Sequence, residues 1–248
     1  MFPLPYRYPF SLFLYALFVL EFVLLMMGLA FGKLNKERTG RLPRPLRMLL
    51  SALLVLAALL GWQGGAHGTP LQNYAILIFL GMAAGFVGDL IMAELIPVPN
   101  RLIFGMIEFS IGHLFYIAAF LNLLQSHFVA MRVNLIGLLI AILGFCVCAW
   151  YAYVRKPGGS KVMNVGSLVY GLLIGTMVTL AVVLAIGDAH FVPLALGAWL
   201  FLASDFILGN WVIRGHVWKS VNDVIWVAYV CGQLLIVYSV AAALHVWQ

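Results

Sequence analysis

The stretch QNYAILIFLGMAAGFVGDLIMA, residues 72–93, is long and apolar enough to cross a lipid bilayer as one helix. Crossing the hydrocarbon core takes roughly 20 apolar residues in helical conformation. The stretch nevertheless contains one charged side chain, Asp89, near its carboxyl end. An ionisable group at such depth is costly unless it faces the interior of a helix bundle or a wet cavity. The segment therefore predicts a membrane-spanning helix and marks Asp89 as a candidate functional residue.

The composition of the whole chain agrees with a membrane protein. Of its 248 residues, 65% are hydrophobic and only 9% are charged, and the mean hydropathy is +1.07. A soluble domain of this length carries far more charge. The net charge of +6 is interpreted as a determinant of membrane orientation, since no basic stripe with interleaved aromatic residues indicates nucleic-acid binding.

Eight segments have the length and hydropathy of spanning helices. They are residues 9–31, 46–62, 72–93, 102–124, 131–154, 162–187, 190–212 and 220–247. The first is too long for the core of a signal peptide, so we expect it to be retained. The connecting segments are too short to separate domains. The expected fold is all-α, with residues 1–248 forming a single bundle of eight transmembrane helices.

Lysine and arginine are distributed unevenly between the two ends of this bundle. Twelve lie in or beside the odd-numbered loops, and only Arg7 and Arg132 lie on the other side. Cytoplasmic loops are enriched in these residues. We therefore expect the odd loops to be cytoplasmic and both termini to lie on the opposite side.

A second acid, Asp205, occupies a comparable place in the seventh predicted span. The third and seventh spans run in the same direction, so Asp89 and Asp205 should lie at matching depth near the cytoplasmic edge. This predicts one polar cavity shared by the two carboxyl groups. Gly81, Gly85 and Gly88 accompany Asp89, and small residues at this spacing allow helices to approach closely.

Further polar residues accompany the two acids in the apolar spans. The last span carries a stripe of Asn222, Trp226, Tyr229 and Gln233, spaced so that all four share one helix face, which we expect to point inward. The candidate pocket residues are His113, Tyr116, Tyr170, Ser204, Asn210, Tyr229 and Gln233. Asp188 and Asp223 are interpreted as ordinary residues at helix ends near water. Glu108 is expected either to extend toward Arg101 or to join the cavity, and Glu21 is assigned no role.

The pattern disfavours a nucleophilic serine, a zinc site and a disulfide framework. Ser204 lacks the GxSxG context of a nucleophilic serine. The histidines are scattered, and Cys146, Cys148 and Cys231 lie in apolar segments without a CxxC spacing, so neither a zinc site nor a disulfide framework is expected. We expect no metal and no cofactor.

Several short motifs resemble the YhhN family of lysoplasmalogenase-like membrane proteins. Their order and approximate spacing agree over about 200 residues. They are Arg44-Pro45, Val87-Gly88-Asp89, Phe109…Gly112-His113-Leu-Phe-Tyr116…Ala119-Phe120, Val169-Tyr170-Gly171, Leu196-Gly197-Ala198…Phe201-Leu-Ala-Ser204-Asp205 and Tyr229…Gln233-Leu234-Leu235-Ile236.

The resemblance implies eight spans and hydrolysis of the vinyl ether bond of a lysolipid, giving a fatty aldehyde and a glycerophospho-base. Asp89 and Asp205 match the two motif acids. Acid cleavage of a vinyl ether needs a proton donor and a carboxylate that stabilises positive charge and orients water, and two carboxyl groups in one cavity can divide these roles. A proton-coupled transporter and a lipid-binding membrane protein remain as alternatives. The expected partners are the lysolipid and membrane lipids; the oligomeric state is not predicted.

Overall fold

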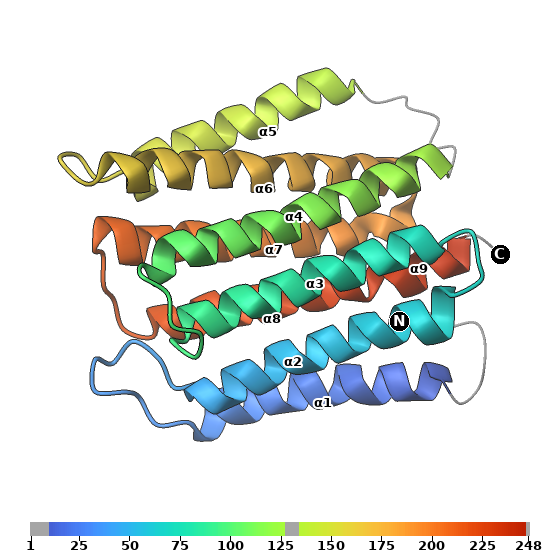
Figure 1. The fold of residues 1–248 in the computed structure, drawn as a ribbon, viewed down its shortest axis with the longest axis horizontal. Helices are drawn as coiled ribbons and strands as arrows, with labels where there is room; N and C mark the ends of the chain where they lie inside the picture. The colour runs from blue at the N-terminus through green and yellow to red at the C-terminus, as the bar shows by residue number, and fades with distance from the viewer. Residues whose placement is uncertain (1–9, 127–133, 247–248) are drawn as a thin grey trace.

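The computed structural model describes residues 10–126 and 134–246, and within these ranges every regular element is helical. Figure 1 shows the helices running side by side along the long axis of the molecule. Eight of the helical stretches are long and apolar enough to cross a membrane, which confirms the predicted fold class. The elements are α1 (Phe10–Phe31), α2 (Arg44–Leu60), η1 (Gly61–Ala66), α3 (Gln72–Met92), α4 (Arg101–Ser126), α5 (Leu135–Ala149), η2 (Trp150–Val154), α6 (Lys161–Gly187), η3 (Ala189–Phe191), α7 (Val192–Gly209), η4 (Asn210–Arg214), α8 (Val221–Val237) and α9 (Ser239–Val246).

The eight predicted spans coincide with these helices, and most of the differences lie at their ends. The second span continues through a π-helical turn, η1, to Ala66 instead of ending at residue 62. The eighth span is divided at Tyr238 into α8 and α9. π-helical turns also end the fifth and seventh spans, as η2 and η4. Hydropathy identifies apolar length but not the local change of helical pitch, which depends on packing.

Local sequence explains where several helices start and stop. Asn134 and Ser160 cap α5 and α6 by accepting backbone hydrogen bonds, Asn134 from the amide of Gly137 at 2.9 Å. Proline occupies the first turn of α2 and of α7, where its missing N–H costs nothing. Gly215 ends η4 with φ of 89°, a left-handed conformation that glycine adopts without a steric penalty.

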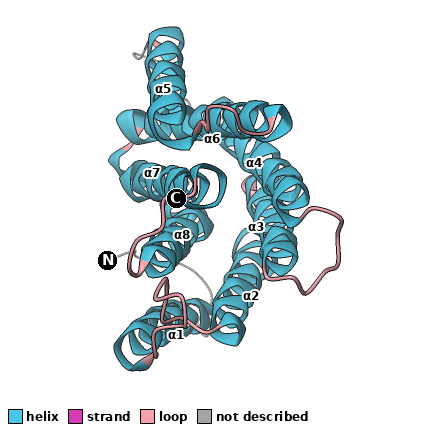
Figure 2. Ribbon diagram, turned by 90° about the vertical axis from the view of Figure 1, so that its left-hand side faces the viewer, coloured by secondary structure: helices cyan, strands magenta, loops and turns pink. Residues whose placement is uncertain are grey.

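Helices α7 and α8 lie beside each other on one side of the bundle when it is viewed along the helix axes (Figure 2). Helices α2, α3, α4 and α6 curve around them, while α1 packs on α2 and α5 packs on α6 at the two edges. A Cβ on Gly112 would lie 2.9 Å from the carbonyl oxygen of Gly81, so α3 and α4 approach closely through glycine, as the small residues of the third span predict.

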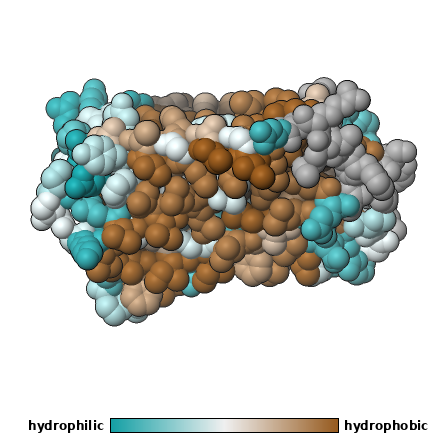
Figure 3. All heavy atoms as spheres, turned by 90° about the horizontal axis from the view of Figure 1, so that it is seen from above, coloured by the Kyte–Doolittle hydropathy of each residue, from teal (hydrophilic) through white to brown (hydrophobic). Residues whose placement is uncertain are grey.

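Basic residues gather at one end of the bundle. The loops after α1, α3, η2 and η4 all lie at the left-hand end in Figure 1. Figure 3 shows hydrophilic residues at both ends of the molecule and a broad hydrophobic belt between them. All twelve described lysines and arginines belong to this basic end, and the remaining two, Arg7 and Arg132, lie outside the described residues.

The prediction that Asp223 is an ordinary residue near water is wrong. Its side chain is buried, and its Oδ1 accepts hydrogen bonds from the backbone amides of Arg41 at 2.6 Å and Leu42 at 3.3 Å. The Nε of Arg41 lies 3.9 Å from its other oxygen. The acid therefore joins the first loop to the start of α8, a contact between distant segments that sequence spacing does not reveal.

Candidate active site

Asp89 of α3 and Asp205 of α7 line the same cavity. The cavity has a volume of about 290 Å³ and lies at the basic end of the bundle, where residues of the first loop and Arg101 form part of its wall. Trp226 and Tyr229 of α8 complete the side opposite α3. The helices thus bring together two carboxyl groups that are 116 positions apart in the chain, as expected from their matching places in spans three and seven.

Hydroxyl groups from two helices hold the carboxyl group of Asp89. Its Oδ2 accepts hydrogen bonds from Ser51 Oγ of α2 and from Tyr229 OH of α8, the latter at 2.6 Å. The side chain is almost fully buried, with 5% of its surface exposed. A carboxylate that accepts two hydrogen bonds on one oxygen retains acceptor capacity on the other oxygen. That second oxygen is available to a substrate or a water molecule.

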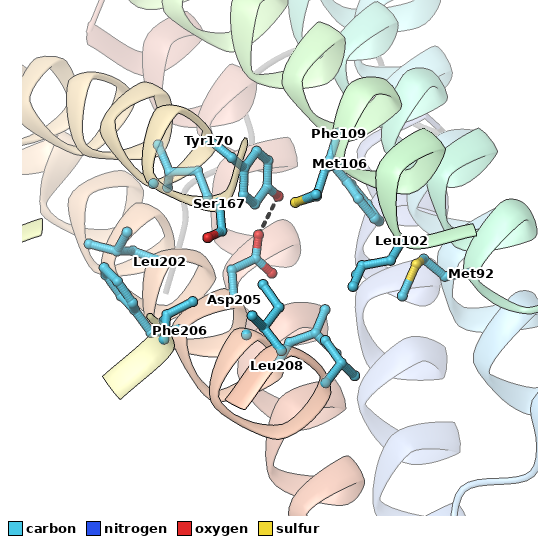
Figure 4. Close-up of a pocket in the computed structure, with 16 residues that line it drawn as sticks. Met92, Leu102, Met106, Phe109, Ser167, Tyr170, Leu202, Asp205, Phe206 and Leu208 are labelled. Atoms are coloured by element: carbon cyan, nitrogen blue, oxygen red, sulfur yellow. Dashed lines mark hydrogen bonds between the residues drawn. The ribbon is translucent and has the colours of Figure 1, made fainter. Parts of the chain in front are cut away.

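Asp205 lies where the polar cavity meets an apolar pocket. It accepts a hydrogen bond from Tyr170 OH of α6, drawn as a dashed line in Figure 4. The apolar pocket lies between α4, α6 and α7 and measures about 50 Å³. Its lining includes Met106, Phe109 and Phe206. Both spaces are lined by Asp205 and Phe109, so one carboxyl group borders a polar and an apolar compartment.

His113 of α4 supports Asp205 through Tyr170. The Nε2 of His113 lies 3.3 Å from Tyr170 OH, which donates to Asp205. The imidazole is buried and its edge packs against the ring of Phe201 at 4.7 Å between centroids. Its Nδ1 has no hydrogen-bond partner among the described residues. His113 is therefore placed behind Tyr170 and does not line the cavity itself.

Tyr116 and Gln233 form a pair deeper in the bundle. Tyr116 OH donates to Gln233 Oε1 at 2.8 Å, and both residues are buried. Gln233 follows Tyr229 by one helical turn on α8, which places the pair about 6 Å further from the basic end. The inward-facing stripe predicted on the last span is thus observed, since Asn222, Trp226 and Tyr229 line the cavity and Gln233 lies beyond it.

Ser204 and Asn210 differ in their relation to the cavity. Ser204 lines it, with its hydroxyl donating to the carbonyl oxygen of Phe201 at 2.7 Å and lying 3.3 Å from Asp205 Oδ1. Asn210 does not join the other candidate residues. Its Nδ2 donates to the carbonyl oxygen of Tyr153 at 2.6 Å, and it lines a separate groove beside α5. Asn210 follows Asp205 by five residues, which places it on another face of the seventh span.

Two residues of α2 belong to the site although their roles were not identified from the sequence. Ser51 donates to Asp89, and Arg47 lines the cavity one turn away. The available signal was their spacing of four positions, which places two polar side chains on one face of an otherwise apolar helix. Serine is common in membrane helices, so the pattern by itself did not distinguish Ser51 from a packing residue.

The remaining intramembrane acids lie outside this arrangement. Glu21 of α1 is fully buried, and neither carboxyl oxygen has a hydrogen-bond partner among the described residues. Glu108 is half-buried on α4, and the ion pair of Arg101 is made with Glu94 instead. Among the described residues, no group of three or more histidine, cysteine, aspartate or glutamate side chains is placed to hold a metal ion.

The comparisons with known proteins agree with the motifs along the chain. The model of the YhhN family matches residues 42–240, from the start of α2 to the start of α9. Searches of curated proteins and of solved structures gave no match. The matched segment contains every residue that lines the cavity except those of the first loop. Because the family model covers most of its length, this chain belongs to the YhhN family.

Proposed function

We propose that this protein is a lysoplasmalogenase-like hydrolase, which cleaves the vinyl ether bond of a lysolipid with Asp89 and Asp205 as catalytic residues. Membership of the YhhN family is consistent with this function. The observation that carries the proposal is the position of Asp205, which borders both the polar cavity and the apolar pocket. A lysolipid has one apolar chain and one polar headgroup, and its vinyl ether bond lies at the junction between them.

Such a substrate matches the two compartments. The headgroup would lie in the polar cavity at the basic end, and the chain would begin in the apolar pocket between α4, α6 and α7. The chain would reach this pocket from the bilayer by passing between these helices. The reacting bond would then lie beside Asp205.

The hydrogen bonds support different roles for the two acids, which the sequence left open. In the proposed reaction, Asp205 protonates the β-carbon of the vinyl ether and leaves an oxocarbenium ion. Water adds to the carbon bonded to oxygen and gives its proton to Asp89, whose two hydroxyl donors suit an ionised carboxylate. The hemiacetal then collapses: Asp89 protonates the departing glycerol oxygen, and the hemiacetal hydroxyl returns a proton to Asp205. The sum is one lysolipid and one water converted to a fatty aldehyde and a glycerophospho-base.

The other candidate residues would position these groups. Tyr170 would orient Asp205, with His113 behind it, while Tyr229 would orient Asp89. Ser204 would contact the substrate from the cavity wall. Tyr116 and Gln233 would close the inner end of the site.

We further propose that residues 1–248 form a single domain in the cell membrane, with the basic end in the cytoplasm. The eight apolar helices are compatible with an integral membrane protein. The concentration of lysine and arginine at one end supports the orientation.

The proposal predicts that both acids are needed for turnover. We expect Asp89→Asn and Asp205→Asn each to lower the rate of aldehyde release by at least about 100-fold, because each removes a group that transfers a proton. The rate is measured by mass spectrometry with purified protein in detergent and a 1-alkenyl lysolipid. Asp188→Asn is the matched control: it removes the same charge at the opposite end, and asparagine also serves as a helix cap.

The outcome against the proposal is near-normal aldehyde release by either folded cavity variant. A proton-coupled transporter is the second candidate, favoured by the same pair of acids in a membrane cavity. Consumption of the lysolipid without a proton gradient distinguishes the two. A lipid-binding protein without activity would bind the lysolipid and release no aldehyde.

A further inference from the structure

Arg47 is a charged residue of the polar cavity that the proposed reaction does not use. It lies in the first turn of α2 and lines the cavity together with Asp89 and Asp205. Its Nε is buried and has no hydrogen-bond partner, and it forms no ion pair with any described residue. Its guanidinium lies over the ring of Trp226, with Cζ 5.2 Å from the ring centroid. A half-buried arginine without a hydrogen bond or ion pair from its side chain retains unused donors that a bound anion can accept.

We propose that Arg47 and Trp226 form a subsite for the phosphate group of a lysophospholipid. This inference rests on the proposed function, since it assigns the headgroup of the same substrate. Guanidinium groups bind phosphate through paired hydrogen bonds, and an aromatic ring beneath the guanidinium fixes its plane. The subsite would make a phosphate-bearing lysolipid the preferred substrate over one that ends in a free glycerol.

The spacing along the helices fits the length of such a substrate. Arg47 and Ser51 are four residues apart on α2, which is about 6 Å along the axis. Ser51 donates to Asp89, so the guanidinium lies about one helical turn from the carboxyl group, on the side of the basic end. Helix α8 repeats the arrangement, since Trp226 contacts Arg47 and Tyr229, three residues later, contacts Asp89.

In a lysophospholipid, five bonds join the ether oxygen on the first glycerol carbon to phosphorus. An extended chain of this length spans roughly 6 Å, because three backbone bonds of an extended peptide span about 3.5 Å. The residues that hold Asp89, Ser51 and Tyr229, therefore lie at the level of the reacting ether. Arg47 and Trp226, one helical turn closer to the basic end, lie at the level of the phosphate. The residues beyond, in the first loop, are left for the base attached to the phosphate.

The test is a comparison of binding that does not require turnover. Full-length protein in detergent is titrated by calorimetry with a saturated 1-O-alkyl lysophosphocholine and with the 1-O-alkylglycerol of the same chain. We expect the wild type to bind the phosphate-bearing ligand at least about 10-fold more tightly, because a hydrogen bond between charged groups contributes this much to affinity. Arg47→Gln should reduce this ratio to near one, and Arg47→Lys should retain part of it.

Arg44→Gln is the matched control, because it removes the same charge from the same helix turn. Arg44 is exposed, donates to the carbonyl oxygen of Ala93 and does not line the cavity. The variant should keep the wild-type ratio. If Arg47→Gln does not fold, Arg47→Met replaces it, since methionine keeps the apolar stem over Trp226 without the charge. If the folded, uncharged variant keeps the wild-type ratio of the two affinities, the proposed subsite is wrong.

Inorganic phosphate is titrated separately to identify the source of the anion. We expect it to bind at least about 10-fold more weakly than the lysophosphocholine, because it lacks the chain. Equal affinity would assign Arg47 to free phosphate and overturn the lipid assignment. A phosphate preference that depends on Arg47, in a protein that releases no aldehyde, would overturn the proposed hydrolysis and leave the subsite intact.

Discussion

Asp89 and Asp205 share a cavity but are held by different partners. Two hydroxyl groups, from Ser51 and Tyr229, donate to one oxygen of Asp89. The main donor to Asp205 is Tyr170, because the hydroxyl of Ser204 is closer to the carbonyl oxygen of Phe201. Environment rather than residue type thus distinguishes two chemically identical side chains, as it does in enzymes that use a pair of carboxyl groups.

At this scale we predict that Ser51→Ala and Tyr229→Phe each lower kcat for lysolipid hydrolysis by about 10- to 100-fold. Each change removes one hydrogen bond to a carboxylate, an interaction worth about 1.5–3 kcal/mol. Steady-state kinetics of aldehyde release give the values. Tyr74→Phe is the control, since Tyr74 is equally buried but bonds to Ser239, away from the cavity. A kcat for both cavity variants equal to that of the control would show that these donors do not act on Asp89.

The relative position of α7 and α8 determines how Asp205 and Tyr229 face each other. The two helices approach through glycine on both sides. A Cβ on Gly197 would lie 2.8 Å from the carbonyl oxygen of Gly232, and a Cβ on Gly232 would lie 2.9 Å from that of Gly197. Such contacts involve backbone atoms on both sides, so neither side can yield without moving a helix.

We therefore predict that Gly232→Ala lowers both stability and activity. The added methyl group must push α7 and α8 apart, at a cost of about 1–3 kcal/mol, the usual range for overpacking. Thermal unfolding in detergent and aldehyde release are the two measurements. Gly144→Ala in α5 is the control, because no described atom lies within 4 Å of the position of its Cβ. Equal melting temperatures for the two variants would contradict the close approach.

The positive charges of the molecule are concentrated at one end of the helix bundle. All described lysines and arginines lie at the end where the cavity is found. The cytoplasmic leaflet carries anionic lipids, which attract such a surface. In the proposed orientation, the proposed lysolipid substrate would reach the site from the cytoplasmic leaflet.

This arrangement predicts the accessibility of the loops in intact cells. In a background without the three native cysteines, His67→Cys in the second loop should react with a membrane-impermeant maleimide. Pro99→Cys in the third loop should react only after the membrane is permeabilised. Both positions are exposed and neither changes the number of lysines and arginines. The reverse labelling pattern would place the basic end outside the cytoplasm and contradict the orientation.

The spans and the two acids were predictable from the sequence, because each depends on a property of one segment. Length and hydropathy identify a spanning helix, and a lone acid within it marks an interior position. The burial of Asp223 and the position of Asn210 were not predictable. The first depends on a loop more than 180 positions away, and the second on a contact with the carbonyl oxygen of Tyr153, from another span.

The sequence by itself determined that the chain forms apolar helices, which segments are long enough to cross a membrane, which end is basic and that Asp89 and Asp205 occupy matching places in two spans. These properties follow from the free energy of transferring each segment from water to lipid, which depends on that segment alone. Only the tertiary structure decided that Ser51 and Tyr229 hold Asp89, that Tyr170 holds Asp205, and that the guanidinium of Arg47 lies over Trp226 in the same cavity. Hydropathy does not identify such partners, because a given helix face can contact either lipid or protein. Which of the two it contacts depends on how all the other helices pack.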